Sequence, residues 1–203
     1  MADTPDGPRH TPPVGAEYLP LIAALMQIDA PIVLFGGFAE DAMLGGSIRR
    51  PHDDVDILIE RSMFPRGLEI FDELGFETPE VRWEPVPNEP LVVGTLRDDG
   101  LNLELSVFEV SDGTRSFTLP DAAGHLFRVA MPPDMLSAPP FMLEEIEVRT
   151  VSPLAQYQIR EGLGILGPLG PMRPKDVASQ AALRDRFFAT RSEEELKPSI
   201  EPR

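Results

Sequence analysis

The sequence contains no cysteine, which excludes a disulfide framework and a zinc site built on thiolates. It also has no apolar run that approaches the roughly 18 residues of a simple transmembrane helix. The first 13 residues, MADTPDGPRHTPP, lack the apolar stretch that a signal peptide requires. From these absences we expect a cytoplasmic protein that does not span a membrane.

Positively charged side chains are in the minority. The chain has 18 Lys and Arg against 34 Asp and Glu, so its formal net charge is −16. A field of this sign repels polyanions, which argues against general binding to nucleic acid or to anionic membranes. It favours a small cationic partner, but acidity also maintains solubility, and the composition is compatible with both interpretations.

The length of 203 residues is enough for one hydrophobic core with a small additional lobe. The hydrophobic fraction of 42% is ordinary for a globular protein, whereas the 23 prolines are unusually many and predict frequent turns. We expect a flexible tail over residues 1–14, a core over 15–150, a helical C-terminal part over 151–192 and a second flexible tail over 193–203.

Hydrophobic periodicity divides the chain into helical and extended segments. It predicts helices over residues 16–28, 38–44, 65–74, 152–161 and 175–190. It predicts extended segments over residues 32–35, 54–60, 78–85, 90–96, 101–110, 116–119, 126–131 and 142–149. Asp98-Asp99-Gly100 is a hairpin turn signal, and a Gly/Pro-rich bridge over residues 162–174 separates the last two helices. We therefore predict an α/β (α+β) fold, a small mixed sheet flanked by helices with a small helical part at the C-terminal end.

The stretch from Pro31 to Glu60 contains two acidic residues two positions apart. Asp54 and Asp56 project to the same face of the predicted strand, while the apolar residues between and after them point into the core. Neighbouring carboxylates repel one another unless a cation lies between them, and Mg²⁺ is the usual choice. An exposed acidic strand end produces the same short pattern, so the pair alone is weakly specific.

A pair of glycines, Gly36 and Gly37, lies between the first predicted strand and its helix. Glycines at such a position let the backbone approach a ligand closely, and the helix N-terminus offers free N–H groups to an anion. A tight strand-to-helix turn without any ligand requires the same residues. The pair becomes specific only in combination with the two aspartates.

The combined segment, GGFAEDAMLGGSIRRPHDDVDILI, resembles the nucleotidyltransferase superfamily of the DNA polymerase β type, and within it the aminoglycoside and lincosamide nucleotidyltransferase branch. The residues that match the branch pattern are Gly36, Gly37, Phe38, Asp41, Gly45, Arg50, His52, Asp54 and Asp56. One extra residue lies between Gly45 and Arg50 by comparison with some members. The resemblance is strongest over residues 32–60 and extends more loosely to about residue 176.

The resemblance implies a third carboxylate on a later strand. Glu104 fits this position, because strand alternation places it opposite Leu103 and Leu105; the family often has aspartate here. Glu109 is the alternative. By resemblance Asp54, Asp56 and Glu104 are the catalytic residues and bind Mg²⁺, and Glu104 is either the general base or a metal ligand only.

The resemblance also implies a nucleotide-binding set, which comprises Gly36, Gly37, Arg50 and Lys175. Arg50 either contacts phosphate or pairs with Asp41 to brace the loop, and we expect His52 to be a loop-bracing hydrogen bonder. Lys175 and Asp176 resemble a family K-D pair, although a solvated helix start is an equal alternative for the lysine. Ser179 stands where the family has a further aspartate.

The activity implied by the resemblance is Mg²⁺-dependent nucleotidyl transfer. A nucleoside monophosphate, with AMP from ATP expected, moves from a nucleoside triphosphate to a hydroxyl of a small-molecule acceptor of the aminoglycoside or lincosamide kind, and pyrophosphate is released. One alternative is a toxin-like enzyme that modifies RNA or protein, although the acidic composition disfavours RNA. The other is a non-catalytic nucleotide-binding regulatory module, against which the three retained carboxylates argue. The acceptor, the preferred base and the oligomeric state remain open.

Overall fold

The computed structural model describes residues 15–167 and 170–203. Its strands are β1 (Val33–Phe35), β2 (Val55–Glu60), β3 (Glu80–Trp83), β4 (Val92–Leu96), β5 (Asn102–Ser111), β6 (Thr114–Pro120), β7 (Leu126–Ala130), β8 (Phe141–Leu143), β9 (Ile146–Val148) and β10 (Ser199–Pro202). Its helices are η1 (Ala16–Tyr18), α1 (Leu19–Gln27), α2 (Gly36–Leu44), η2 (Arg61–Met63), α3 (Phe64–Glu73), α4 (Pro153–Leu166), α5 (Pro174–Phe187) and α6 (Glu193–Leu196).

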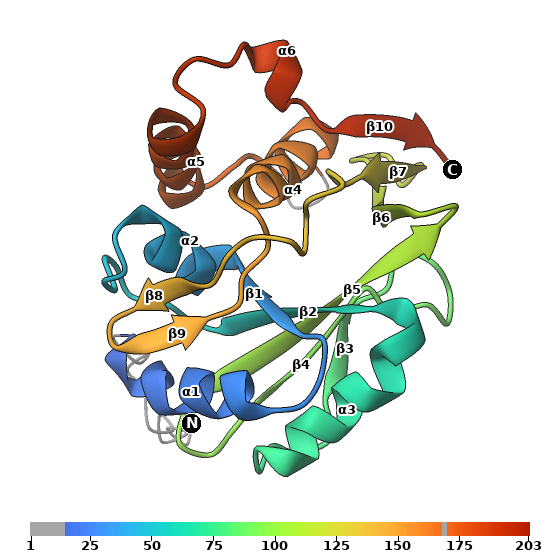
Figure 1. Cartoon of the computed structure of the whole chain (residues 1–203). Helices are drawn as coiled ribbons and strands as arrows, with labels where there is room; N and C mark the ends of the chain where they lie inside the picture. Colours follow the sequence, from blue (N-terminus) through green and yellow to red (C-terminus); the bar gives the residue numbers. More distant parts are fainter. Residues whose placement is uncertain (1–14, 168–169) are drawn as a thin grey trace, which may run out of the picture.

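The sheet is mixed and is built around the long strand β5. The first part of β5 lies between β2, which runs parallel to it, and β4, which runs antiparallel. Strand β1 pairs with β2 and β3 pairs with β4, both antiparallel. The last part of β5 leaves this core and pairs with β6, after which β7 and β10 continue the sheet. Figure 1 shows that this extension lies beside the C-terminal helices.

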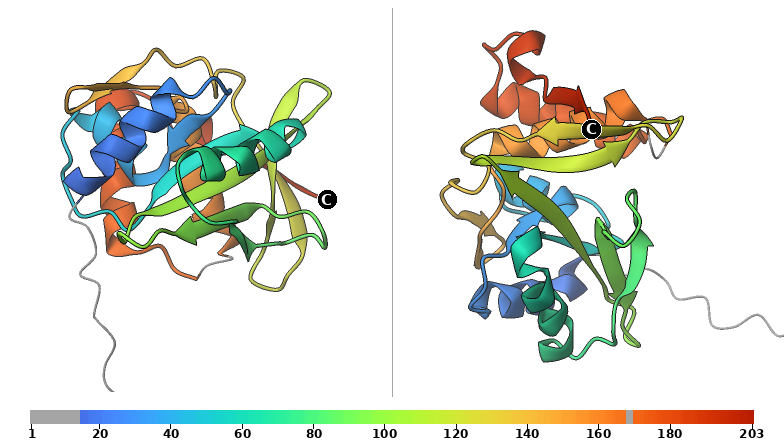
Figure 2. Two further views of the ribbon diagram at one scale, coloured as in Figure 1. Left: turned by 90° about the horizontal axis from the view of Figure 1, so that it is seen from below. Right: turned by 90° about the vertical axis from the view of Figure 1, so that its right-hand side faces the viewer.

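The two faces of the core sheet differ in chemistry. Helix α3 packs on the apolar face, where Gly67 allows it to approach Leu105 and Ile59 closely. The opposite face carries Asp56 and Glu104. Figure 1 shows α1 and α3 on one side of the sheet and α4 and α5 on the other, and the left view of Figure 2, from below, has α1 and α3 in front. Strand alternation therefore separates a buried apolar side from a carboxylate side that faces the C-terminal helices.

The predicted fold class is confirmed, as is the hairpin between β4 and β5. Some segments differ from the prediction, and α2 begins two residues before its predicted start, at Gly36. Residues 142–149 form the hairpin β8–β9 rather than one extended stretch, because Glu144 reverses the chain with a φ of 49°. Helix α4 continues to Leu166, beyond the predicted end at residue 161, because Gly162 lets it pack closely against Val129.

The prediction of a flexible tail over residues 193–203 is wrong. Helix α6 begins with a capping box between Ser192 and Glu195, and Leu196 is buried. Strand β10 then pairs along its whole length with β7. The charged sequence shows no periodic signal for either element. The pairing partner of β10 lies about 70 positions earlier in the chain, so the strand could not be predicted locally. The other predicted tail, residues 1–14, lies outside the described residues.

No helix in residues 15–167 and 170–203 is long and apolar enough to cross a membrane. The expected cytoplasmic location stays a prediction.

Candidate active site

The turn from β1 into α2 brings the backbone against the acidic strand. Gly36 has a φ of +67°, and a Cβ atom added to it would overlap the carboxylate of Asp56. A Cβ atom added to Gly37 would collide with the ring of His52 and would lie 3.0 Å from the Arg50 guanidinium. Both glycines are therefore required by close approach, and the first also by its left-handed backbone.

Three carboxylates converge on the open face of the core sheet. Asp54 immediately precedes β2, Asp56 lies within it, and Glu104 lies directly beside Asp56 on the parallel strand β5. One oxygen of each residue lies within 4.8 Å of an oxygen of the other two. The structure thus brings together the three residues that the sequence predicted as a cluster.

The environment of this cluster opposes its negative charge. Burial raises the pKa of Asp56 well above its usual range, and the charges of Asp54 and Glu104 raise it further. The pKa of Asp54 is raised by burial and by Asp53, and that of Glu104 by burial and by Asp54. A hard divalent cation with oxygen ligands relieves such repulsion, so the donor set fits Mg²⁺.

The loop between α2 and β2 is held by a buried aspartate. The Asp41 carboxylate lies 2.7 Å from Nε2 of His52 and accepts hydrogen bonds of 3.1 Å from the backbone N–H and Nε of Arg49. Burial alone would raise the pKa of Asp41, but the hydrogen bonds from His52 and Arg49 outweigh it and lower the pKa. His52 braces the loop as predicted.

Arg50 does not pair with Asp41, so that alternative is wrong. Arg49 occupies the partner position, while the Nη2 atom of Arg50 lies 3.6 Å from Oε2 of Glu40. Arg50 instead lines a cavity of about 460 Å³ that also contains the three carboxylates. This volume lies in the range of small-molecule sites.

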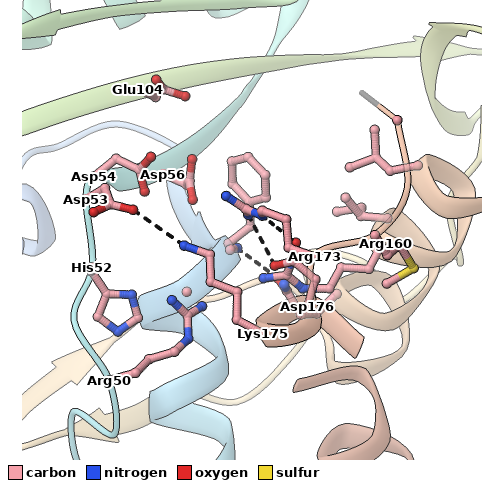
Figure 3. A pocket seen from close by; sticks show the side chains of 18 of the residues that line it. Arg50, His52, Asp53, Asp54, Asp56, Glu104, Arg160, Arg173, Lys175 and Asp176 are labelled. Carbon is pink, nitrogen blue, oxygen red and sulfur yellow. Dashed lines mark hydrogen bonds and ion pairs between the residues drawn. The ribbon is translucent and has the colours of Figure 1, made fainter. Parts of the chain in front are cut away.

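The wall opposite the carboxylates comes from α4, α5 and the residues before α5 (Figure 3). Lys175 points across the cavity, and its Nζ atom lies 3.4 Å from Oδ2 of Asp53. Arg160 and Arg173 reach the cavity from α4 and from the residue before α5, and both pair with Asp176. Lys175 therefore lines the predicted cavity from the first turn of α5, with 35% of its side chain exposed, and its binding of nucleotide stays a prediction.

The sequence did not indicate Arg160, Arg173 and Gln156, which line the cavity, or Glu40, which is buried behind them. Arg160 and Gln156 lie one turn apart on α4, but nothing in their spacing distinguishes them from other polar residues of a helix. Glu109, the alternative third carboxylate, lies outside the cavity and is 3.9 Å from Arg61.

An apolar group completes the cavity beside the charged walls. It consists of Phe35, Ile159, Leu163, Pro171 and Met172. Met172 lies directly against the backbone of α4, where a Cβ atom on Gly164 would be 2.8 Å from its sulfur. The cavity therefore offers a carboxylate side, a cationic side and an apolar surface.

This arrangement defines the chain as a protein of the nucleotidyltransferase class: a glycine turn opens a helix, and carboxylates on two parallel strands face it. A sequence model of the aminoglycoside-2''-adenylyltransferase family matches residues 18–166, and the chain belongs to that family. A search of curated protein sequences gives no significant match.

Solved structures show the same fold at low sequence identity. A lincomycin-bound lincosamide antibiotic adenylyltransferase, LnuA, is 19% identical with a TM-score of 0.56, over 84% of this chain and 97% of that one. ANT(2'')-Ia in complex with adenylyl-2''-tobramycin is 20% identical with a TM-score of 0.58, over 87% of each chain. A solution structure of ANT(2'')-Ia is 19% identical with a TM-score of 0.59, over 87% of this chain and 82% of that one.

Proposed function

We propose that the protein transfers a nucleoside monophosphate, AMP from ATP, to a hydroxyl group of a small-molecule acceptor and releases pyrophosphate. The observation that carries the proposal is the convergence of Asp54, Asp56 and Glu104 within 4.8 Å on a cavity that also has a cationic wall. A purely structural cluster would not need three carboxylates whose pKa values are all raised.

Asp54, Asp56 and Glu104 would hold Mg²⁺. When bound, the ion neutralises charge on the triphosphate and on the pyrophosphate leaving group. Glu104 takes the proton from the acceptor hydroxyl. The acceptor oxygen forms a bond to the α-phosphorus while the bond from that phosphorus to the bridging oxygen breaks.

The triphosphate is bound by Gly37, Arg50 and Lys175. The first N–H groups of α2 have no partner within the helix and can donate to phosphate oxygens. The N–H of Gly36 already donates to Oε1 of Gln156 at 3.1 Å. Gly36 therefore contributes by letting the turn approach Asp56, while Gly37 supplies the backbone donor.

We infer an acceptor of the aminoglycoside or lincosamide kind. The family match and the two antibiotic-bound neighbours, one with lincomycin and one with an adenylylated tobramycin, support this class. The net charge of −16 suits a polycationic aminoglycoside, and a lincosamide would depend on it less. The apolar part of the cavity offers a surface for either sugar-bearing acceptor.

The proposal is tested by pyrophosphate release with Mg²⁺, each nucleoside triphosphate and a panel of aminoglycosides and lincosamides, for the wild type and Asp56→Ala. We expect release that requires a small acceptor and is lost in the variant. Label that appears on RNA or protein would indicate a macromolecular target instead. Nucleotide binding without release for any acceptor would indicate a regulatory module.

A further inference from the structure

A chain of buried ionic contacts lies directly behind the cationic wall. The Glu40 carboxylate is fully buried on α2 and forms an ion pair with Nε of Arg160. Arg160 in turn donates from Nη1 to Asp176 at 2.8 Å, and Asp176 accepts from Arg173 at 2.7 Å. This chain joins α2, α4 and α5 around the cavity.

Glu40 is fixed on its other side by Gln156. The amide Nε2 of Gln156 donates to Oε1 of Glu40 at 3.0 Å, while its Oε1 accepts from the N–H of Gly36. The second oxygen of Glu40, Oε2, is buried and has no hydrogen-bond partner among the described residues; the Arg50 guanidinium lies 3.6 Å away. A buried carboxylate between two arginines holds both against the cavity wall.

These contacts use two of the three guanidinium nitrogens of Arg160. Nε donates to Glu40 and Nη1 to Asp176, whereas Nη2 has no hydrogen-bond partner in residues 15–167 and 170–203. The residue lines the cavity, and its positive charge acts on Asp56 across it. Figure 3 shows Arg160 on the side of the cavity opposite the carboxylates.

We propose that Arg160 binds the triphosphate of the substrate through Nη2, and that Glu40 is the positioning residue that orients Arg160 for this contact. The proposal rests on the proposed function for the identity of the substrate. A planar guanidinium with two nitrogens already anchored loses little freedom when the third meets a phosphate oxygen. Glu40 occupies a variable position of the motif, between Ala39 and Asp41. The pairing of Glu40 with Arg160 is therefore not part of the motif itself.

The test uses calorimetric titration of the whole protein with inorganic tripolyphosphate in the presence of Mg²⁺. Arg160→Met should weaken binding about tenfold or more, and Glu40→Gln severalfold. In the double variant the loss should equal that of Arg160→Met alone, because Glu40 acts through Arg160. Arg66→Met, which removes a partly exposed arginine on α3 far from the cavity lining, is the matched control and should bind like the wild type.

Several outcomes would overturn the proposal: no binding of tripolyphosphate to the wild type, wild-type binding by folded Arg160→Met, or additive losses in the double variant. If Arg160→Met fails to fold, the double variant is compared directly with the wild type and should bind tripolyphosphate about tenfold or more weakly. We expect the double variant to fold, because it removes both charges of the pair and Asp176 retains its ion pair with Arg173. Arg160→Met should also raise the KM for nucleoside triphosphate without changing the KM for the acceptor. Because tripolyphosphate binding needs no turnover, the result is independent of whether nucleotidyl transfer is found.

Discussion

Asp56 is the residue at which the proposed chemistry and the stability of the fold oppose each other. It is surrounded by Asp54, Glu104 and a buried protein environment, and all three raise its pKa. The folded protein therefore binds the Asp56 proton more tightly than the unfolded chain does. Ionisation of Asp56 therefore destabilises the folded state. This destabilisation is absent below the ordinary carboxyl pKa of about 3.9 and grows as the pH rises above it.

Replacing Asp56 with asparagine should separate stability from activity. In metal-free protein at neutral pH, Asp56→Asn should have a higher melting temperature than the wild type, and the difference should vanish as the pH falls toward 4 and below. The same variant should lose activity by a factor on the order of 10²–10³ or more, because an electrostatic group at the reacting centre is removed. Thermal unfolding across pH and pyrophosphate release are the measurements.

Mg²⁺ supplies the control for this interpretation. Added metal should raise the melting temperature of the wild type more than that of Asp56→Asn, since binding to the folded state alone stabilises it. Chelation with EDTA should reverse the rise. An Asp56→Asn protein that is less stable than the metal-free wild type at pH 7 would contradict the account of the cluster.

Gly36→Ala tests whether the turn is shaped by the carboxylates. Its positive φ should cost about 1–2 kcal/mol of unfolding free energy, and the Cβ atom must also displace Asp56, so activity should be lost. Gly75→Ala is the matched control, because Gly75 has a φ of +72° and open space around its Cβ position. It should lose similar backbone stability and keep full activity. Equal activity in the two variants would contradict the assignment.

The carboxylates were predictable from the sequence because strand alternation decides which side chains share a face. Asp54, Asp56 and Glu104 needed only that rule and the resemblance of the surrounding motif. Arg160 and Glu40 were not predictable, since their meeting depends on how α4 docks against α2, across 120 positions of chain. The partner of Asp41 was not predictable for the same reason. Arg49 rather than Arg50 donates to Asp41, and this choice depends on the geometry of the loop.

The loop from α2 to β2 depends on Asp41. Because hydrogen bonds lower the pKa of Asp41, its stabilising contribution is present above the unfolded pKa and is lost as the pH falls through the folded one. Asp41→Asn should lower the unfolding free energy by about 1–3 kcal/mol at neutral pH, and the difference from the wild type should shrink below about pH 4. Denaturant unfolding at several pH values measures this.

Asp99→Asn is a suitable comparison for the Asp41 variant. Asp99 also has a lowered pKa, owing to hydrogen bonds from Arg97, but that pair lies at the surface. Its removal should change the unfolding free energy by less than about 1 kcal/mol. An Asp41→Asn effect no larger than this would show that the loop is held by other contacts.

Elements with local signals were predicted well, and elements defined by distant partners were not. The hairpin β4–β5 follows from Asp98-Asp99-Gly100, and α4 begins at the predicted cap, where the Ser152 side chain accepts from Ala155. Strand β10 has no such signal, because only β7 makes it a strand. The end of α4 was hidden for a related reason: glycine weakens an isolated helix but here allows contact with β7.

The whole molecule carries a charge of −16, which should influence how a charged acceptor arrives. Attraction between exposed charges is screened by salt over about 10 Å at 0.1 M ionic strength. If a polycationic aminoglycoside is the acceptor, its KM should rise severalfold between low and physiological salt, whereas the KM of a neutral or singly charged acceptor should change little. Steady-state kinetics at several salt concentrations measure this, and an unchanged KM for a polycation would contradict electrostatic steering.

The position of the transferred phosphorus tests the proposed chemistry most directly. The protein is incubated with Mg²⁺, an acceptor that supports pyrophosphate release, and ATP labelled at either the α- or the γ-phosphorus. We predict that α-label moves onto the acceptor, that γ-label leaves in pyrophosphate, and that Asp56→Asn abolishes both. Transfer of γ-label to the acceptor, or α-label transfer that survives the substitution, would contradict nucleotidyl transfer at the Asp54, Asp56 and Glu104 cluster.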